Sequence, residues 1–166
     1  MKAIQVGILG LGTVGGGTAL VLQRNAAEIA RRTGKTITLH SVANLDMARA
    51  KSLVGEQVVV TDDAFSVVRN PEIDVIVELI GGTGLAKTLV LEAIAHGKHV
   101  VTANKALIAN YGNEILAAAQ EKGVSVAFEA AVAGGIPIIK AVREGLAANK
   151  IDWIAGIING TSNFIL

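Results

Sequence analysis

The sequence predicts an α/β fold in which a parallel sheet carries helices on both of its faces. Short runs rich in valine and isoleucine alternate with longer stretches whose apolar residues recur at helical spacing. The short runs are almost continuously apolar, which is typical of strands buried on both faces of a parallel sheet. Strands that alternate with helices are joined by right-handed crossovers, so the order of elements also favours this architecture.

The first half of the chain predicts three strand–helix units. Residues 4–9 form an apolar, β-branched run and are expected to be a buried strand. Residues 13–32 follow as one helix, because alanine, leucine and isoleucine populate one broad face. The other elements expected here are strands at 36–43 and 57–60 and helices at 46–53 and 62–68. The dipeptide Asn70-Pro71 marks a turn after them.

The second half repeats the pattern. The strands expected here are residues 74–79, 98–102 and 124–129, and the helices are residues 85–96 and 104–122. Gly97 and Gly123 suit the ends of these helices, where glycine readily takes the left-handed conformation. Gly112 is expected to break the longer helix, because glycine is a poor helix former. Six strands in this order fit a doubly wound Rossmann sheet.

The pattern changes after residue 129. Residues 130–137 form a glycine-containing, loop-like stretch, residues 138–148 predict a helix, and residues 153–158 resemble a strand. The sequence then stops within a turn-like segment. We therefore expect a Rossmann domain over residues 1–130 and the beginning of a second, α+β domain over residues 131–166, in a fragment of a longer protein.

Composition excludes several classes of protein and site. The formal net charge of +1 gives no reason to expect a nucleic-acid or anionic-membrane partner. The 166 residues contain no cysteine, which excludes disulfides and thiolate metal sites. No secretory signal is evident, and no apolar run reaches the roughly 18 residues of a membrane-spanning helix. We expect a cytoplasmic protein.

The loop after the first strand has the pattern of a phosphate-binding turn. Gly10-Leu11-Gly12-Thr13-Val14-Gly15 matches G-x-G-x-x-G between a predicted strand and a predicted helix, which is the context that the motif requires. Gly10 permits a tight turn, Gly12 lets a pyrophosphate approach the backbone, and Gly15 lets the helix pack closely on the strand. The helix N-terminus adds free N–H groups and partial positive charge. The loop therefore predicts binding of a nicotinamide dinucleotide.

The choice between NAD and NADP stays open. An acidic residue after the second strand binds the ribose hydroxyls of NAD, whereas a nearby arginine accommodates the additional phosphate of NADP. Asp46 suits the first role, or it caps the next helix. Arg49 or Lys51 suits the second role, although both also fit exposed helix charges. We expect NAD or dual use.

Three later segments follow strands, at the sheet edge where open α/β folds bind ligands. They are Glu78-Leu79-Ile80-Gly81-Gly82-Thr83, the run from His99 to Leu107, and the run from Glu129 to Ile138. Lys105 stands out, because Asn104 or Thr102 is a natural N-cap and would place it in a first helical turn. A cation is disfavoured there by the helix dipole, which suits a proton donor or acceptor. The alternative is a solvent-exposed lysine.

These segments, with the terminal run from Gly156 to Leu166, resemble the homoserine dehydrogenase family over the whole chain. Thr102-Ala103-Asn104-Lys105-Ala106-Leu107 and Asn159-Gly160-Thr161-Ser162-Asn163-Phe164 are the most specific parts. The resemblance implies that Lys105 is catalytic and lies between nicotinamide and substrate. It places Gly82 and Thr83 on the nicotinamide side of the cleft and adds Asn44, Asn104 and Lys105 to the cofactor-binding residues of the loop.

The resemblance also implies sites on the later segments. Glu129, Val132, Gly134 and Ile136 correspond to a monovalent-cation site, for an ion such as Na⁺, built mostly from backbone carbonyls. Glu129 could instead be a structural hydrogen-bond partner. Gly160 and Thr161 would approach the substrate. Residues 131–166 would begin the catalytic and dimerisation domain.

The implied reaction is the reversible reduction of L-aspartate 4-semialdehyde to L-homoserine with NAD(P)H, in the biosynthesis of threonine, methionine and isoleucine. A homo-oligomer is implied for the full-length protein, and the fragment alone is expected to be inactive. The alternatives are another Rossmann amino-acid or semialdehyde dehydrogenase, and a non-catalytic dinucleotide-binding module.

Overall fold

A computed structural model describes residues 2–157 of the chain, and its central feature is a six-stranded, fully parallel sheet with the strand order β3-β2-β1-β4-β5-β6. The strands are β1 (Ile4–Leu9), β2 (Ile37–Ala43), β3 (Val59–Thr61), β4 (Val75–Glu78), β5 (His99–Thr102) and β6 (Val126–Ala127). This is the doubly wound order predicted from the sequence, and the direction of winding reverses between β1 and β4.

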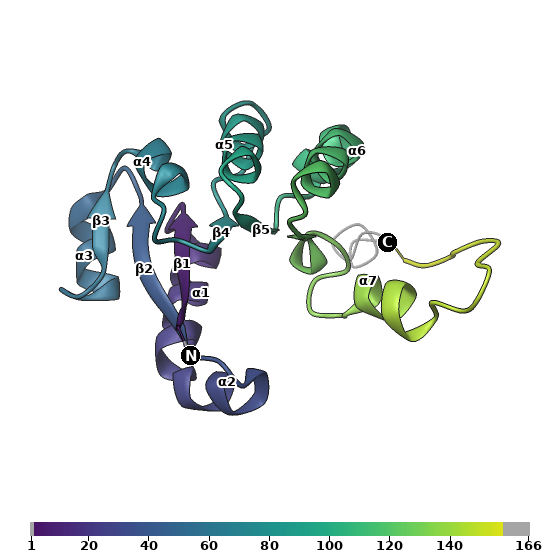
Figure 1. Ribbon diagram of the computed structural model, residues 1–166, viewed down its shortest axis with the longest axis horizontal. Helices are drawn as coiled ribbons and strands as arrows, with labels where there is room; N and C mark the ends of the chain where they lie inside the picture. The colour runs from purple at the N-terminus through teal and green to yellow at the C-terminus, as the bar shows by residue number, and fades with distance from the viewer. Residues whose placement is uncertain (1, 158–166) are drawn as a thin grey trace.

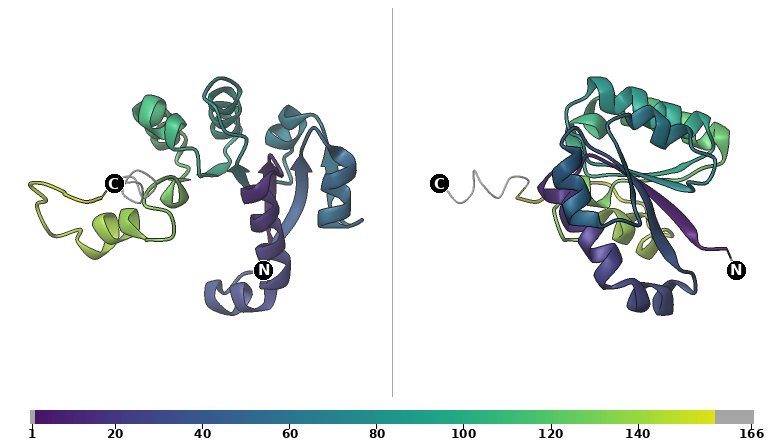
Figure 2. Two further views of the ribbon diagram at one scale, coloured as in Figure 1. Left: turned by 180° about the vertical axis from the view of Figure 1, so that it is seen from behind. Right: turned by 90° about the vertical axis from the view of Figure 1, so that its left-hand side faces the viewer.

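Helices cover the sheet in two layers (Figures 1 and 2). The helices α4 (Ala64–Arg69), α5 (Gly84–Ala95) and α6 (Lys105–Lys122) lie on one face. The helices α1 (Thr13–Arg24), α2 (Ala26–Thr33) and α3 (Met47–Val54) belong to the other. Each layer closes over its own apolar core: Leu89, Ile94 and Ile115 are central to the first, and Ile8 and Val42 to the second. The carboxyl ends of these strands position the loops described below.

Two predicted helix boundaries in the sheet domain are wrong. The single helix expected over residues 13–32 is two helices, because the chain leaves helical geometry at Asn25, a residue whose side chain competes for backbone hydrogen bonds. The break expected at Gly112 is absent, and α6 is continuous. Its buried residues Leu107, Ile115 and Ala119 pack in the core, which outweighs the local cost of about 1 kcal/mol for one glycine.

Residues beyond β6 depart furthest from expectation. The strand expected at 124–129 is only two residues long, and a 3₁₀ turn (Glu129–Ala131) follows. The helix expected at 138–148 is reduced to α7 (Ile138–Lys140) and a wide turn (Ala141–Gly145), neither of which buries a residue. Of the strand expected at 153–158, residue 158 lies outside the described residues, and residues 153–157 form no strand, since no described strand lies beside them. Short elements without a packed face or a partner are not stable in water.

Candidate functional site at the carboxyl edge of the sheet

The glycine loop has the geometry that its pattern predicts. Gly10 has a φ of +88°, and a Cβ there would lie 2.9 Å from the Leu79 carbonyl oxygen. A Cβ on Gly15 would lie only 2.0 Å from the Gly10 carbonyl oxygen, so α1 starts directly against the turn. Gly12 is exposed and a Cβ there would meet nothing within 4 Å. Two glycines thus shape the loop, and the third leaves its outer side open to a ligand.

The glycines that follow the motif have different surroundings. A Cβ on Gly16 would approach Leu53 of α3 to 3.3 Å, which favours helix packing as the reason for that glycine. Gly17 is exposed, and a Cβ there would meet nothing within 4 Å.

Asn44 ties the loop to the end of β2. Its Oδ1 accepts a hydrogen bond from the Leu11 N–H at 2.9 Å, and its Nδ2 donates to the Asp46 carbonyl at 2.9 Å. The Asp46 carboxylate accepts from the Arg49 N–H at 3.0 Å and so caps α3. Of the two basic candidates, Lys51 forms a salt bridge with Glu56 at 3.1 Å, whereas Arg49 lines the same hollow as the glycine loop.

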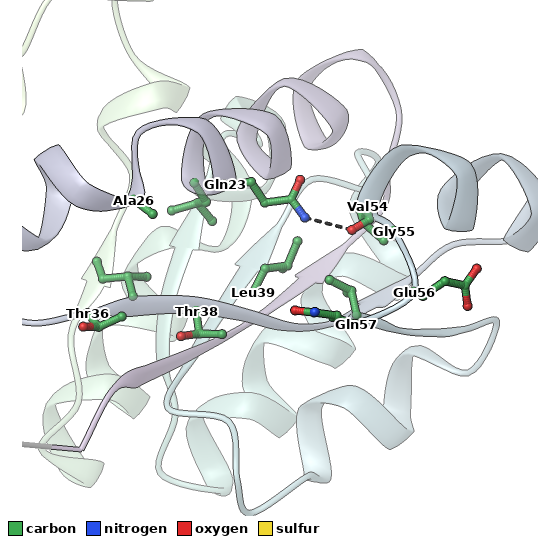
Figure 3. A pocket seen from close by; sticks show the side chains of 12 residues that line it. Gln23, Ala26, Thr36, Thr38, Leu39, Val54, Gly55, Glu56 and Gln57 are labelled. Atoms are coloured by element: carbon green, nitrogen blue, oxygen red, sulfur yellow. Dashed lines mark hydrogen bonds between the residues drawn. The ribbon is translucent and has the colours of Figure 1, made fainter.

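Two hollows differ in their chemistry. The larger, of about 470 Å³, lies at the amino end of β2, between that strand and the end of α1 (Figure 3). Its Gln23 amide donates to the Val54 carbonyl at 2.8 Å, and Glu56 is the charged residue in its lining. The smaller, of about 350 Å³, is lined by Gly12, Thr13 and Arg49 among others. The smaller one brings the start of α1 and the cation of Arg49 together, a combination that favours an anion.

The loops after β4 and β5 are joined by hydrogen bonds. Glu78, the last residue of β4, is fully buried; one carboxylate oxygen accepts from the N–H groups of Ile80 (2.9 Å) and Gly81 (3.2 Å). Its other oxygen accepts from the Thr102 hydroxyl at 2.6 Å, and that hydroxyl accepts from the Asn104 N–H at 3.0 Å. These loops therefore form one connected edge.

Asn104 completes the connection and starts α6. Its Nδ2 donates to the Gly82 carbonyl at 2.6 Å, and its Oδ1 caps the helix by accepting from the Leu107 N–H at 3.1 Å. Lys105 is the first residue of α6, as the N-cap prediction required, and it is exposed, as the alternative of a solvent-exposed lysine required. Thr83 occupies the N-cap position of α5, where its side chain makes no capping hydrogen bond.

Sequence reasoning gave no role to the Glu78 side chain. The available signal was a glutamate that ends an apolar strand, but its partner Thr102 lies 24 residues away, and only the β4–β5 register brings them together.

The residues expected to bind a cation lie in one segment after β6, but some of their oxygens already accept hydrogen bonds from the protein. The Glu129 carboxylate accepts from the N–H groups of Ile139 (2.8 Å) and Lys140 (3.0 Å), which is the structural role considered as the alternative. The Ile136 carbonyl accepts from the Ile138 N–H. Within residues 2–157, the carbonyls of Val132 and Gly134 accept no backbone hydrogen bond.

The part of the chain that the structure describes contains neither a metal-binding cluster of side chains nor a helix able to cross a membrane. Among residues 2–157, no three histidine, aspartate or glutamate side chains cluster as a metal site would require. In the same range, no helix is long and apolar enough to cross a membrane. Gly160 and Thr161, expected at the substrate, lie outside the described residues.

Comparison with known proteins identifies relatives of the chain. The sequence-family model of the homoserine dehydrogenase NAD-binding domain matches residues 10–129, and the family model of homoserine dehydrogenase matches residues 137–166. The chain is 66% identical to a homoserine dehydrogenase of Pseudomonas aeruginosa and 58% identical to that of Neisseria gonorrhoeae, over its whole length and 38% of theirs. It therefore spans well under half of these relatives.

Solved structures agree with the sequence comparison. The crystal structure of a homoserine dehydrogenase from Thiobacillus denitrificans is 65% identical, with a TM-score of 0.93 over 99% of this chain and 38% of that one. A hyperthermophilic archaeal homoserine dehydrogenase in complex with NADPH is 27% identical, with a TM-score of 0.70 over 89% of this chain and 50% of that one.

Proposed function

Because the chain belongs to the homoserine dehydrogenase family, we propose that its protein interconverts L-aspartate 4-semialdehyde and L-homoserine with a nicotinamide cofactor. The reaction would serve the biosynthesis of threonine, methionine and isoleucine. One observation supports the proposal above the others. The open glycine loop and the loop with Lys105 both border the turn after β4, at the point where the winding of the sheet reverses.

The cofactor is NAD or NADP, and NADPH is the molecule bound to the archaeal relative. When bound, it supplies or accepts the hydride of the reaction. The residues proposed to hold it are Gly10, Leu11, Gly12, Thr13, Val14, Gly15, Asn44, Gly82, Thr83, Asn104 and Lys105. The first N–H groups of α1 bind the phosphates, and Asn44 keeps the loop in place through the Leu11 N–H.

Lys105 is the proposed catalytic residue. In the reducing direction its ammonium group gives a proton to the alkoxide oxygen formed on the substrate, and in the oxidising direction the amine takes that proton back. It lies in the first turn of α6, beside the turn after β4 where the cofactor is proposed to bind.

The later residues complete the proposal. Residues 1–130 are the cofactor domain, and residues 131–166 begin the domain that binds substrate and forms the oligomer. Gly160 and Thr161 approach the substrate. Glu129, Val132, Gly134 and Ile136 form a monovalent-cation site, in which the free carbonyls of Val132 and Gly134 are the best-suited ligands. The full-length protein is a cytoplasmic homo-oligomer, and residues 1–166 alone have no activity.

The test is homoserine-dependent reduction of NAD⁺ and NADP⁺ by the full-length protein, beside a Lys105→Ala variant and a charge-retaining Lys105→Arg variant. We expect turnover in the wild type and a loss of about 10²- to 10⁴-fold in both variants, because neither can exchange a proton near neutral pH. Cofactor binding with no homoserine oxidation would instead indicate another substrate or a sensing role. Full activity in Lys105→Ala would remove the lysine from the mechanism.

A further inference from the structure

We propose, as a deepening that rests on the proposed function, that Glu78 is a positioning residue. Its buried carboxylate fixes the start of α6, and with it Lys105, against the turn after β4 before a cofactor binds. Glu78 touches neither the reacting atoms nor the cofactor in this proposal; it acts through Thr102 and Asn104.

The burial of Glu78 requires an explanation. It is fully buried at the end of a strand whose preceding residues, Val75, Ile76 and Val77, are all apolar. A carboxylate removed from water is costly unless polar groups replace its hydration. Within residues 2–157 no lysine, arginine or histidine forms an ion pair with it. Two backbone N–H groups and one hydroxyl take that place, so these donors are held where the carboxylate needs them.

The hydrogen bonds form a closed ring across two loops. The ring runs from Glu78 through the Thr102 hydroxyl to Asn104, from the Asn104 amide to the Gly82 carbonyl, and back along the turn to the Gly81 N–H and Glu78. Gly81 and Gly82 have φ values of +81° and +67°. A turn of two left-handed glycines has little conformational preference of its own, so the ring selects its shape.

The ring bears directly on Lys105. Asn104 is a member of the ring and also the N-cap of α6, through the Leu107 N–H. Any shift of Asn104 therefore moves the first residue of the helix, and the long side chain of Lys105 amplifies the movement at its Nζ. A displacement of about 1 Å at a reacting group can cost on the order of a hundredfold in rate.

The chemistry of the ring distinguishes glutamate from its closest analogue. All three groups around Glu78 donate hydrogen bonds, and an ionised carboxylate only accepts. In Glu78→Gln the amide oxygen can still accept from the turn, and the amide NH₂ can donate to the Thr102 oxygen, which has a second lone pair. The hydroxyl proton of Thr102 loses its acceptor, so the variant keeps the turn and weakens the link to the start of α6.

The decisive experiment compares Thr102→Val with Thr102→Ser in the full-length enzyme, with Glu78→Gln as the second test. Valine matches threonine in shape and removes the hydroxyl, whereas serine retains it. Lys98→Met is the control, because Lys98 is buried at the opposite edge of the sheet and donates to carbonyls of the turn before β4. The measurements are unfolding midpoint, kcat, the KM for homoserine, and the dissociation constants of NAD⁺ and NADP⁺ from fluorescence titration.

We expect Thr102→Val to lower kcat by about ten- to a hundredfold, and Glu78→Gln to lower it less, at a temperature where both are folded. The KM for homoserine changes little, Thr102→Ser stays near wild type, and Lys98→Met loses stability but keeps its kcat. If Thr102→Val loses stability and keeps its kcat and its cofactor affinity, the ring is only structural and the proposal is overturned.

The test also separates this proposal from the proposed reaction. If the wild-type enzyme does not oxidise homoserine, the reaction is wrong, and cofactor binding then decides the role of Glu78. A severalfold weakening of cofactor binding in Thr102→Val that is absent in Thr102→Ser supports it, because the ring shapes the turn with Gly82. Equal affinities in the two variants overturn it.

Discussion

At the scale of single residues, we propose that Arg49 recognises the additional phosphate of NADP. It lines the hollow beside Gly12, whereas Lys51 is engaged by Glu56. We expect Arg49→Ala to weaken binding of NADP⁺ by about ten- to a hundredfold, since a hydrogen bond to a charged group contributes about 1.5–3 kcal/mol. Binding of NAD⁺ should change little. Isothermal titration of both cofactors measures the difference.

Lys51→Ala is the matched control for Arg49→Ala, because Lys51 is also basic and lies about half a helical turn from Arg49 in α3. It should leave the preference between cofactors unchanged. Equal losses for NAD⁺ and NADP⁺ in Arg49→Ala would mean that the guanidinium supports the fold of the hollow and does not read the phosphate.

Lys98 is a second residue whose surroundings predict a measurable effect. Its ammonium donates to the carbonyls of Asn70 (2.7 Å) and Ile73 (2.6 Å). Lys98→Met should lower the free energy of unfolding by about 1–3 kcal/mol, because it leaves these carbonyls without their donor. Urea titration near neutral pH tests this. A variant as stable as the wild type would show that water replaces the ammonium at no cost.

The same lysine predicts a pH dependence. Burial lowers the pKa of Lys98 below its usual 10.5, and the charge of Asp74 only partly opposes this. The unfolded chain therefore binds more protons than the folded chain in the pH window just below 10.5. The wild type should gain stability relative to Lys98→Met as the pH rises into that window. A constant difference between the two proteins across that window would contradict the prediction.

At the scale of elements, replacing a glycine with alanine in the glycine loop and in α1 should have three different effects, depending on the position. Gly15→Ala should destabilise the protein by about 1–3 kcal/mol or more, because the new Cβ would overlap the Gly10 carbonyl. Gly17→Ala, inside α1 and in open space, should stabilise it by about 0.5–1 kcal/mol. Gly12→Ala should leave stability nearly unchanged and weaken cofactor binding, because only a ligand would meet the new methyl group.

Thermal unfolding and cofactor titration of the three alanine variants separate these effects. Gly12→Ala with normal cofactor affinity would contradict the assignment of the loop to the pyrophosphate, whatever happened to the other two.

The sequence predicted elements well where local pattern and tertiary packing agree. The boundaries of β1 were predicted correctly because an apolar run and a glycine turn coincide there. Gly112 misled the prediction because its low helix propensity is local, whereas the packing that keeps α6 continuous is not. The helix predicted over residues 138–148 was wrong for the opposite reason, since a short helical segment is not stable without a surface to pack against.

At the scale of the molecule, some parts of the candidate site could be predicted from the sequence and others could not. The glycine loop and the N-cap before Lys105 depend on residues close in sequence and could be predicted. The ring around Glu78 could not, because it depends on the register of two strands and on the joining of two loops. The use of the Glu129 carboxylate by the start of α7 was also beyond sequence, since its partners are ten and eleven residues away.

Residues 151–157 lead to a prediction about the whole protein. Trp153, Ile154 and Ile157 are 79%, 74% and 76% exposed, and this chain spans 38% of the length of its first relatives. Clustered apolar side chains of this size are seldom left in water. We expect the rest of the full-length protein to bury them, with Trp153 as a spectroscopic probe.

Trp153 is the single tryptophan of residues 1–166, so the fluorescence of that fragment reports its environment alone. The fragment should emit at the long wavelength of a hydrated indole and be readily quenched by iodide. In the full-length protein, the difference between wild type and Trp153→Phe isolates the same residue, and its emission should be blue-shifted and protected from iodide. Equal quenching in both would place residues 151–157 on the surface, and the second domain would then be joined to the first by an exposed segment.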